Sequence, residues 1–218
     1  MRIIMTLLAI TLSLTSMAAK SNDDEKIGKY FKSAEFQKQL FDLGVFWDRQ
    51  ILNIQTNCQS KYHLKPISFA YVKPLKFDDN SQHPIEGIWT FRYRFSRCNE
   101  SIIYNAHISA QQGKQPKMAA LFPGTTRASP QLLKDVYLGG LSSIVAKKST
   151  NKQCKKTTVV DTKVTLQPTT AERDGKVIKG VWQEQWQLKH CDELIEATFC
   201  FIPETSGGTT WVIGKCAG

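Results

Sequence analysis

Two arginines, an asparagine and a histidine form the most distinctive candidate site in the sequence. Arg92 and Arg94 are two residues apart in a stretch that alternates aromatic with polar side chains, so both project from one face of a predicted strand. Asn105 and His107 lie on the same face of the next predicted strand. Paired guanidinium groups bind carboxylate or phosphate through two hydrogen bonds. The pattern therefore predicts contact with acidic groups of a partner, and the alternative is an ordinary solvated sheet face.

The charge balance favours an acidic partner. The 218 residues include 29 Lys and Arg against 19 Asp and Glu, which gives a formal net charge of +10. We expect an acidic protein, an acidic glycan or an anionic lipid headgroup. Nucleic acid is disfavoured because no aromatic-basic recognition motif is present. A second basic cluster, for which the alternative is a solvated helix end, follows the second predicted helix: Lys147, Lys148, Lys152, Lys155 and Lys156.

Catalytic and metal-binding motifs are absent from the sequence. It contains no nucleophile elbow, zincin motif, P-loop or dinucleotide fingerprint. Ser33 and Ser129 are explained as helix caps, and Glu100 and Glu193 occupy equivalent tight turns, where a structural role is simpler than a catalytic pair. The four histidines are dispersed and no C-x-x-C pair occurs. We expect no catalytic residue, no metal site and no cofactor.

The first 18 residues predict a secretory signal peptide. Arg2 precedes an apolar run over 3–14, and Ser16-Met17-Ala18 has the small-x-small pattern of a cleavage site. The run is shorter than the roughly 20 apolar residues of a membrane span. Cleavage removes one arginine and no acidic residue, which leaves a net charge of +9. We expect a periplasmic or secreted protein with no transmembrane segment in the mature chain.

The chain contains an internal repeat. Residues 87–102 return as 180–195 with an offset of 93, in the shared pattern Gly-x-Trp followed by Cys-x-Glu. Six cysteines behind a signal peptide predict three disulfides. The repeat favours two equivalent pairs, and the two remaining cysteines flank a Gly-rich turn. The expected pairs are Cys58–Cys98, Cys154–Cys191 and Cys200–Cys216.

The sequence pattern of each copy predicts one helix followed by four strands. Apolar residues recur at helical spacing after Ser33 and again after Ser129, and Gly44 and Gly140 indicate close approach of each helix to a sheet. The period then changes to two. The strands expected from this alternation are 67–77, 89–96, 102–108 and 117–122 in the first copy, and 157–166, 177–189, 194–202 and 210–215 in the second.

These elements predict an α+β fold, a disulfide-stabilised tandem duplication of a helix packed on a four-stranded antiparallel meander. With Cys98 placed opposite Ser101, Arg92 pairs with His107 and Arg94 with Asn105. The expected organisation is a signal peptide (1–18), a mobile lead-in (19–32), a first repeat (33–123), a linker (124–128) and a second repeat (129–218).

In architecture alone, such a unit resembles the cystatin fold, and a tandem of such units resembles the proteinaceous β-lactamase inhibitor. The Q-x-V-x-G loop of cystatins is absent, so the resemblance concerns fold and not function. We expect an exported binding or effector protein of a Gram-negative bacterium, with type II secretion as a route of onward export. The first alternative is an inhibitor of a secreted enzyme, and the second is a small hydrolase whose site has no recognisable motif.

Overall fold

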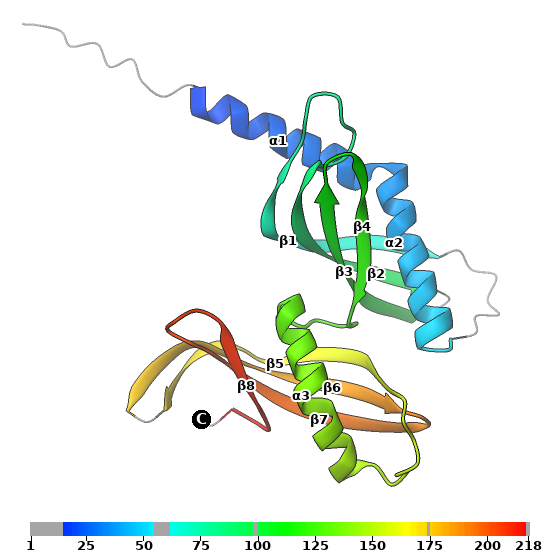
Figure 1. The fold of residues 1–218 in the computed structure, drawn as a ribbon, viewed down its shortest axis with the longest axis vertical. Coiled ribbons are helices and arrows are strands. Elements are labelled where there is room, and N and C mark those ends of the chain that lie inside the picture. The colour runs from blue at the N-terminus through cyan, green and yellow to red at the C-terminus, as the bar shows by residue number, and fades with distance from the viewer. Residues whose placement is uncertain (1–14, 55–61, 98–99, 174, 217–218) are drawn as a thin grey trace, which may run out of the picture.

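The computed structural model describes residues 15–54, 62–97, 100–173 and 175–216, and it contains two four-stranded antiparallel sheets with helices (Figure 1). The first unit comprises α1 (Thr15–Lys32), α2 (Ala34–Phe46), a π-helical turn η1 (Trp47–Ile51), β1 (His63–Lys76), β2 (Glu86–Arg97), β3 (Glu100–Gln111) and β4 (Lys114–Leu121). The second unit comprises α3 (Pro130–Lys148), β5 (Thr157–Arg173), β6 (Lys176–His190), β7 (Glu193–Pro203) and β8 (Thr209–Ile213). In each sheet the strands follow one another in chain order, as a meander.

Helices α2 and α3 begin directly after the serines that the sequence predicts as caps. The Ser33 hydroxyl accepts a hydrogen bond from the Phe36 amide, and the Ser129 hydroxyl accepts one from the Leu132 amide, both at 3.2 Å. The two glycines lie against aromatic rings. A Cβ at Gly44 would lie 2.9 Å from Phe95, and one at Gly140 would lie 3.1 Å from Trp211, so larger residues would push each helix away.

The segment expected to be a mobile lead-in, residues 19–32, is helical and belongs to α1. Ile27, Tyr30 and Phe31 recur at steps of three and four, which places them on one face of the helix. Tyr30 is buried, and its ring lies 4.9 Å from that of Phe36 and 6.0 Å from that of Trp89. The apolar side chains in the last turns of α1 therefore belong to the core of the first unit. The mostly polar composition of the segment did not indicate this role.

The predicted register between β2 and β3 is wrong by two residues. Arg92 pairs with Asn105, Phe95 with Ile102, and Arg97 with Glu100. Because side chains alternate with period two, a shift of two keeps every apolar residue on the same face. Alternation alone could not distinguish the two registers, and the error moved the turn by one position along each strand.

The two central hairpins have the same register. Trp89 pairs with Ile108 in the first sheet, and Trp182 pairs with Phe201 in the second, so both partners are displaced by 93 residues. Each unit has its own buried cluster: one includes Phe36 and Leu40 of α2 with aromatic residues of β2, and the other includes residues of α3 with Trp186 and Phe199.

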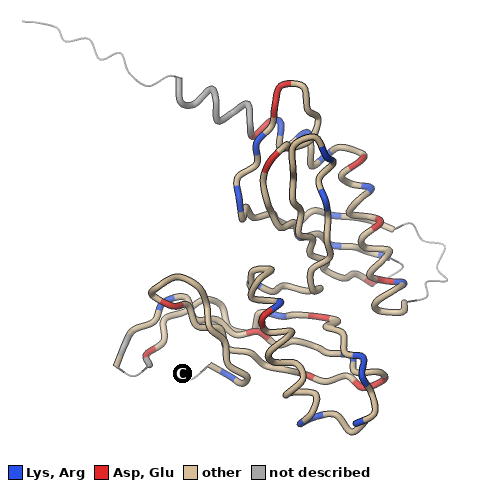
Figure 2. The backbone as a smooth tube through the Cα atoms, in the orientation of Figure 1, with Lys and Arg blue, Asp and Glu red and all other residues tan. Residues whose placement is uncertain are grey.

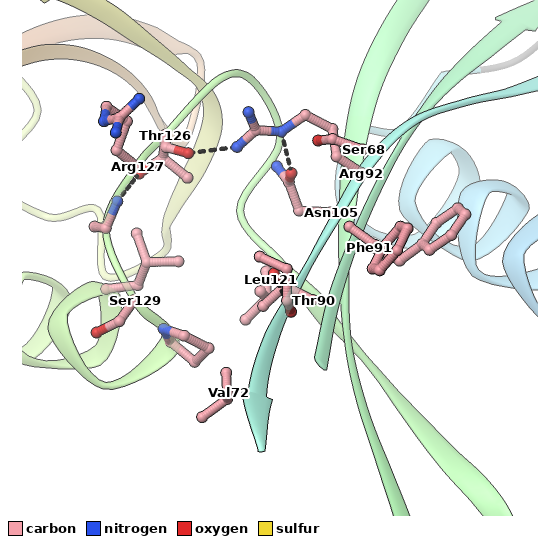
Figure 3. Close-up of a pocket in the computed structure, with 15 residues that line it drawn as sticks. Ser68, Val72, Thr90, Phe91, Arg92, Asn105, Leu121, Thr126, Arg127 and Ser129 are labelled. Atoms are coloured by element: carbon pink, nitrogen blue, oxygen red, sulfur yellow. Dashed lines mark hydrogen bonds between the residues drawn. The ribbon is translucent and has the colours of Figure 1, made fainter. Parts of the chain in front are cut away.

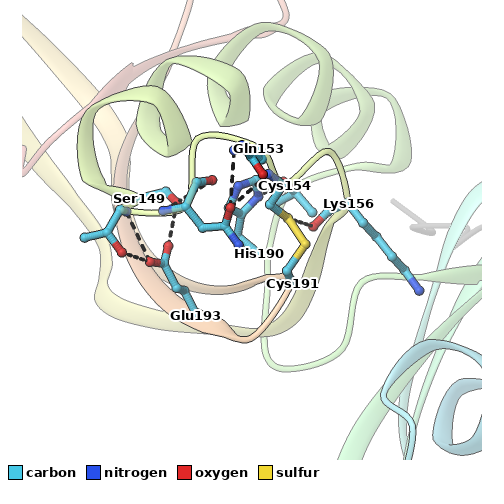
Figure 4. Close-up of a disulfide and its surroundings, with 10 residues drawn as sticks. Ser149, Gln153, Cys154, Lys156, His190, Cys191 and Glu193 are labelled. Carbon is cyan, nitrogen blue, oxygen red and sulfur yellow. Dashed lines mark hydrogen bonds between the residues drawn. A yellow bond between two sulfur atoms is a disulfide. The ribbon is translucent and has the colours of Figure 1, made fainter.

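Two of the three predicted disulfides are confirmed, Cys154–Cys191 and Cys200–Cys216. Figure 4 shows the first of them beside the end of α3. Cys58 and Cys98 lie outside the described residues, so their pairing stays a prediction that non-reducing peptide mapping would test. Disulfides are typical of proteins that fold in an oxidising compartment. Within the described residues, no helix combines the length and apolar character that a bilayer span requires.

Candidate functional site: a cleft at the junction of the two units

The segment between β4 and α3 is bonded to the first sheet. The Asn105 side-chain amide donates to the carbonyl oxygens of Phe122 at 2.8 Å and Gly124 at 3.0 Å. The Gly124 amide donates to the Ile103 carbonyl at 2.8 Å. Arg92 Nη2 donates to the Thr126 carbonyl. We call residues 122–128 the junction, and these hydrogen bonds attach it to the first sheet.

The same junction is bonded to the second sheet. The Thr125 amide donates to the Thr162 carbonyl at 2.6 Å, and the Thr162 hydroxyl donates to the Pro123 carbonyl at 2.5 Å. The Val164 amide donates to the Thr125 hydroxyl at 3.2 Å. Gly124, with φ +99°, passes so close to β5 that a Cβ would lie 2.0 Å from the Thr162 carbonyl oxygen. The segment predicted as a linker is thus fixed between both sheets.

Glu184 is the polar residue of this region that the sequence analysis missed. It is fully buried on β6 between Trp182 and Trp186. Its carboxylate accepts three N–H groups: the Arg127 backbone amide at 2.8 Å, and the indole nitrogens of Trp182 at 2.9 Å and Trp186 at 2.8 Å. An acidic residue in the apolar phase of an alternating strand was the signal that could have identified it.

A cleft of about 330 Å³ lies between the junction and the first sheet (Figure 3). Its polar groups include Arg92, which donates from Nε to the Asn105 side-chain oxygen at 2.8 Å, and Arg127 at the opposite side. The apolar lining comes from both units, including Val72 and Phe91 of the first and Leu133 of α3. A concave surface with few polar groups and a largely apolar lining is typical of a binding site.

The charge in this cleft is not balanced. Within the described residues, neither Arg92 nor Arg127 forms an ion pair. Burial lowers the pKa of Arg92, the negative charge of Glu184 opposes that shift, and the neighbouring positive charge of Arg127 adds to it. The positive charge of Arg92 is therefore influenced by one buried carboxylate, and that carboxylate already accepts three N–H groups.

The structure brings together two of the four residues predicted as a site. Arg92 and Asn105 are hydrogen-bonded to each other and line the cleft. Arg94 is exposed further along β2, opposite Ile103, and does not line it. His107 is half-buried opposite Thr90 and also lies outside the lining, and burial lowers its pKa. The two-residue error in register explains why His107 was predicted opposite Arg92, whereas Arg94 was grouped with Arg92 because the two are two residues apart on one strand.

The second predicted basic cluster is divided among several contacts. Lys148 Nζ donates to the Glu196 carbonyl at 2.7 Å, and Lys152 Nζ donates to the Ala146 carbonyl at the end of α3 at 2.8 Å. Lys147 and Lys155 are exposed, and Lys156 lines a small cavity of about 250 Å³. Figure 2 shows basic residues spread over both units, so net charge by itself does not locate a site.

The two glutamates of the equivalent turns have different surroundings. Glu193 accepts hydrogen bonds from the Ser149 hydroxyl at 2.5 Å and from the Thr150 amide at 3.1 Å, as Figure 4 shows. Glu100 has a mostly exposed side chain, 4.0 Å from Arg97 Nη2. Among the described residues, no group of three or more His, Cys, Asp or Glu side chains is placed to bind a metal ion.

Comparison with known proteins gave no match to a protein-family model, to a curated protein or to a solved structure. A functional assignment for this chain therefore depends on the geometry and chemistry of the cleft.

Proposed function

We propose that this chain is an exported, disulfide-stabilised binding protein of a Gram-negative bacterium that recognises an acidic group in the cleft at the junction. The observation that supports this most strongly is the cleft itself, where Arg92 and Arg127 lie without an ion-pair partner among the described residues. The two disulfides and the apolar N-terminal stretch support export. Surface recognition, rather than catalysis, is the activity that this arrangement favours.

We also propose that the two units are copies of one ancestral unit. Three observations support a duplication: the shared Gly-x-Trp and Cys-x-Glu spacing, the equal register of the two central hairpins, and the equivalent serine caps of α2 and α3. The copies then diverged where they meet. Glu184 of β6 occupies the position of Phe91 in β2, so only the second copy has a carboxylate that bonds to the junction.

The binding proposal is tested with three anionic probes that correspond to the three kinds of partner: poly-glutamate, heparin and vesicles containing phosphatidylglycerol. Arg127 is the residue to change, because its side chain is exposed and only its backbone amide is bonded to Glu184. Arg94 is the matched control, since it is an exposed arginine of the first sheet that does not line the cleft.

We expect Arg127→Gln to weaken binding of at least one probe several-fold at low salt, whereas Arg94→Gln leaves it nearly unchanged. The difference should shrink as salt is raised, because exposed charges are screened. Equal losses in the two variants would mean that only the overall charge matters. Either that outcome or unchanged binding by the Arg127→Gln variant would contradict the proposal that acidic groups bind in the cleft.

Export is tested separately by the mass of the protein in the periplasmic and culture fractions. We expect a chain that begins at Ala19, after cleavage at the small-x-small site. A full-length chain retained in the cytoplasm would contradict the proposal that the protein is exported.

A further inference from the structure

We propose that the ligand of the cleft is a small organic acid, a carboxylate attached to an apolar body, held between the two units. The inference depends on the proposed function, because it names the ligand class of the same site. The cleft combines an unbalanced basic end with an extended apolar lining, and a ligand of this class matches both.

At the basic end of the cleft, Arg92 has N–H donors that its hydrogen bonds within the protein do not use. A guanidinium group has five N–H donors. Arg92 uses one on Nε for Asn105 and one on Nη2 for Thr126, which leaves three for a ligand. These two bonds also fix the orientation of the side chain, so little rotational freedom is lost when an anion binds. Arg127 adds a second guanidinium on a flexible, exposed side chain.

Charge decides between an anionic and a neutral ligand. The buried carboxylate whose charge acts on Arg92, that of Glu184, already accepts three N–H groups. Among the described residues it forms no ion pair with the guanidinium group of either arginine. A ligand carboxylate between Arg92 and Arg127 would reduce the repulsion between them and would accept charge-assisted hydrogen bonds. A neutral ligand of the same shape would leave both cations unpaired.

The apolar lining decides between an organic acid and an inorganic anion. Val72 of β1 is 60% exposed, although it lies in the wall of the cleft. Further apolar lining comes from Leu121 at the end of β4 and from Pro130 and Leu133 at the start of α3. An alkyl or aromatic body that covers the exposed Val72 and the partly exposed Leu121 and Pro130 removes apolar surface from water, and a bare anion such as phosphate does not.

The size of the cleft favours a small molecule over a macromolecular surface. Its volume of about 330 Å³ is near the lower end of the roughly 300–1,000 Å³ typical of small-molecule sites. Both units contribute to the wall, and the hydrogen bonds of the junction fix their spacing. The ligand would therefore contact the first sheet on one side, and the junction and the start of α3 on the other, in a preformed site.

The test uses the isotope-labelled mature protein and nuclear magnetic resonance titrations with hexanoate, 1-hexanol and acetate. Hexanoate has both features, 1-hexanol lacks the charge, and acetate lacks the apolar body. We expect hexanoate to shift the amide signals of Thr126, Arg127 and Ala128, with about tenfold higher affinity than either control.

Three variants separate the two ends of the site. Arg127→Gln should weaken hexanoate binding several-fold, Val72→Ser should weaken hexanoate binding without changing that of acetate, and Arg94→Gln should change neither. Because the Arg127 and Val72 side chains are exposed, the variants are expected to remain folded, and their unperturbed spectra provide the check.

Equal affinity for hexanoate and 1-hexanol would overturn the inference, as would hexanoate shifts that avoid the cleft. Binding of an acetylated peptide with a C-terminal leucine, without binding of hexanoate, would assign the site to a polypeptide end and also overturn it. If hexanoate fails while a polyanion still binds in an Arg127-dependent way, the proposed function stands and the small-acid inference falls.

Discussion

Asp48 and Arg97 form a buried charge pair in the core of the first unit. Their side chains are each 1% exposed, and Nε of Arg97 lies 3.1 Å from Oδ2 of Asp48. Neither of these two atoms makes a hydrogen bond, so the attraction between them is Coulombic. The Tyr104 hydroxyl donates to Asp48 Oδ1. Burial raises the pKa of Asp48, and the bond from Tyr104 and the charge of Arg97 oppose that rise.

At the scale of the residue, we predict that Asp48→Ala is strongly destabilising. It leaves the Arg97 guanidinium buried, with only the mostly exposed Glu100 carboxylate 4.0 Å from Nη2. Breaking one side of a buried pair costs about 3–5 kcal/mol. The double variant Asp48→Leu with Arg97→Met should cost far less, because it removes both charges. Urea unfolding of the three proteins measures this, and a double variant as unstable as the single one would contradict it.

At the scale of the element, Glu193 connects the start of β7 to the end of α3. Ser149 is the C-terminal cap of α3, and its backbone amide donates to the Val145 carbonyl at 2.9 Å. Glu193 accepts from the hydroxyls of Ser149 and Thr150 and from the Thr150 amide. The side-chain hydrogen bond from Ser149, followed by that from Thr150, lowers the pKa of Glu193.

We predict that Glu193→Gln lowers the melting temperature at neutral pH and that the effect fades in acid. A lowered pKa in the folded state means that ionised Glu193 stabilises the fold above its ordinary pKa of 4.5, and that this contribution is lost as the pH falls through the lowered value. The control is Glu204→Gln, an exposed glutamate whose carboxylate has no bond within the described part of the chain. A pH-independent difference in melting temperature would contradict the assignment.

The sequence predicts the elements far better than their contacts. Alternation and the caps at Ser33 and Ser129 locate the strands and the starts of α2 and α3, because those signals are local. Register is not local: a shift of two residues kept the faces of β2 and β3 intact and changed the partner of Arg92 from the predicted His107 to Asn105. The last turns of α1 were missed because three apolar residues stand among many charged ones.

The cleft could be predicted only in part. Arg92 and Asn105 were identified from their strand positions, but Arg127 and Glu184 were not. Their roles depend on contacts between residues far apart in the chain, such as the pair Arg127 and Glu184, separated by 57 positions. No local pattern encodes how two units are joined, so the site between them appears only in three dimensions.

At the scale of the whole molecule, the junction connects two units that each have their own core. We predict that Gly124→Ala uncouples them, because a Cβ there would lie 2.0 Å from the Thr162 carbonyl oxygen. Calorimetry should show unfolding that separates into two transitions. The control is Gly113→Ala, since Gly113 also has a positive φ, of +72°, but no atom lies within 4 Å of an added Cβ.

The two glycine variants share the strain of a left-handed backbone conformation, so any difference between them reports on the contact with Thr162. Identical calorimetric profiles would mean that the junction does not couple the two units. In that case the spacing of the cleft walls would not be fixed by the junction.

Binding of a carboxylate between the two units is tested most directly by a crystal structure of residues 19–218 with a bromine-labelled hexanoate. The anomalous signal of bromine locates the apolar end of the ligand without ambiguity. We predict a peak beside Val72 and Leu133, with the carboxylate between Arg92 and Arg127, so that the ligand contacts the first sheet and the start of α3. A bromine peak at another surface, or an empty cleft that is open to solvent in the same crystals, would contradict the assignment of this cleft as the binding site.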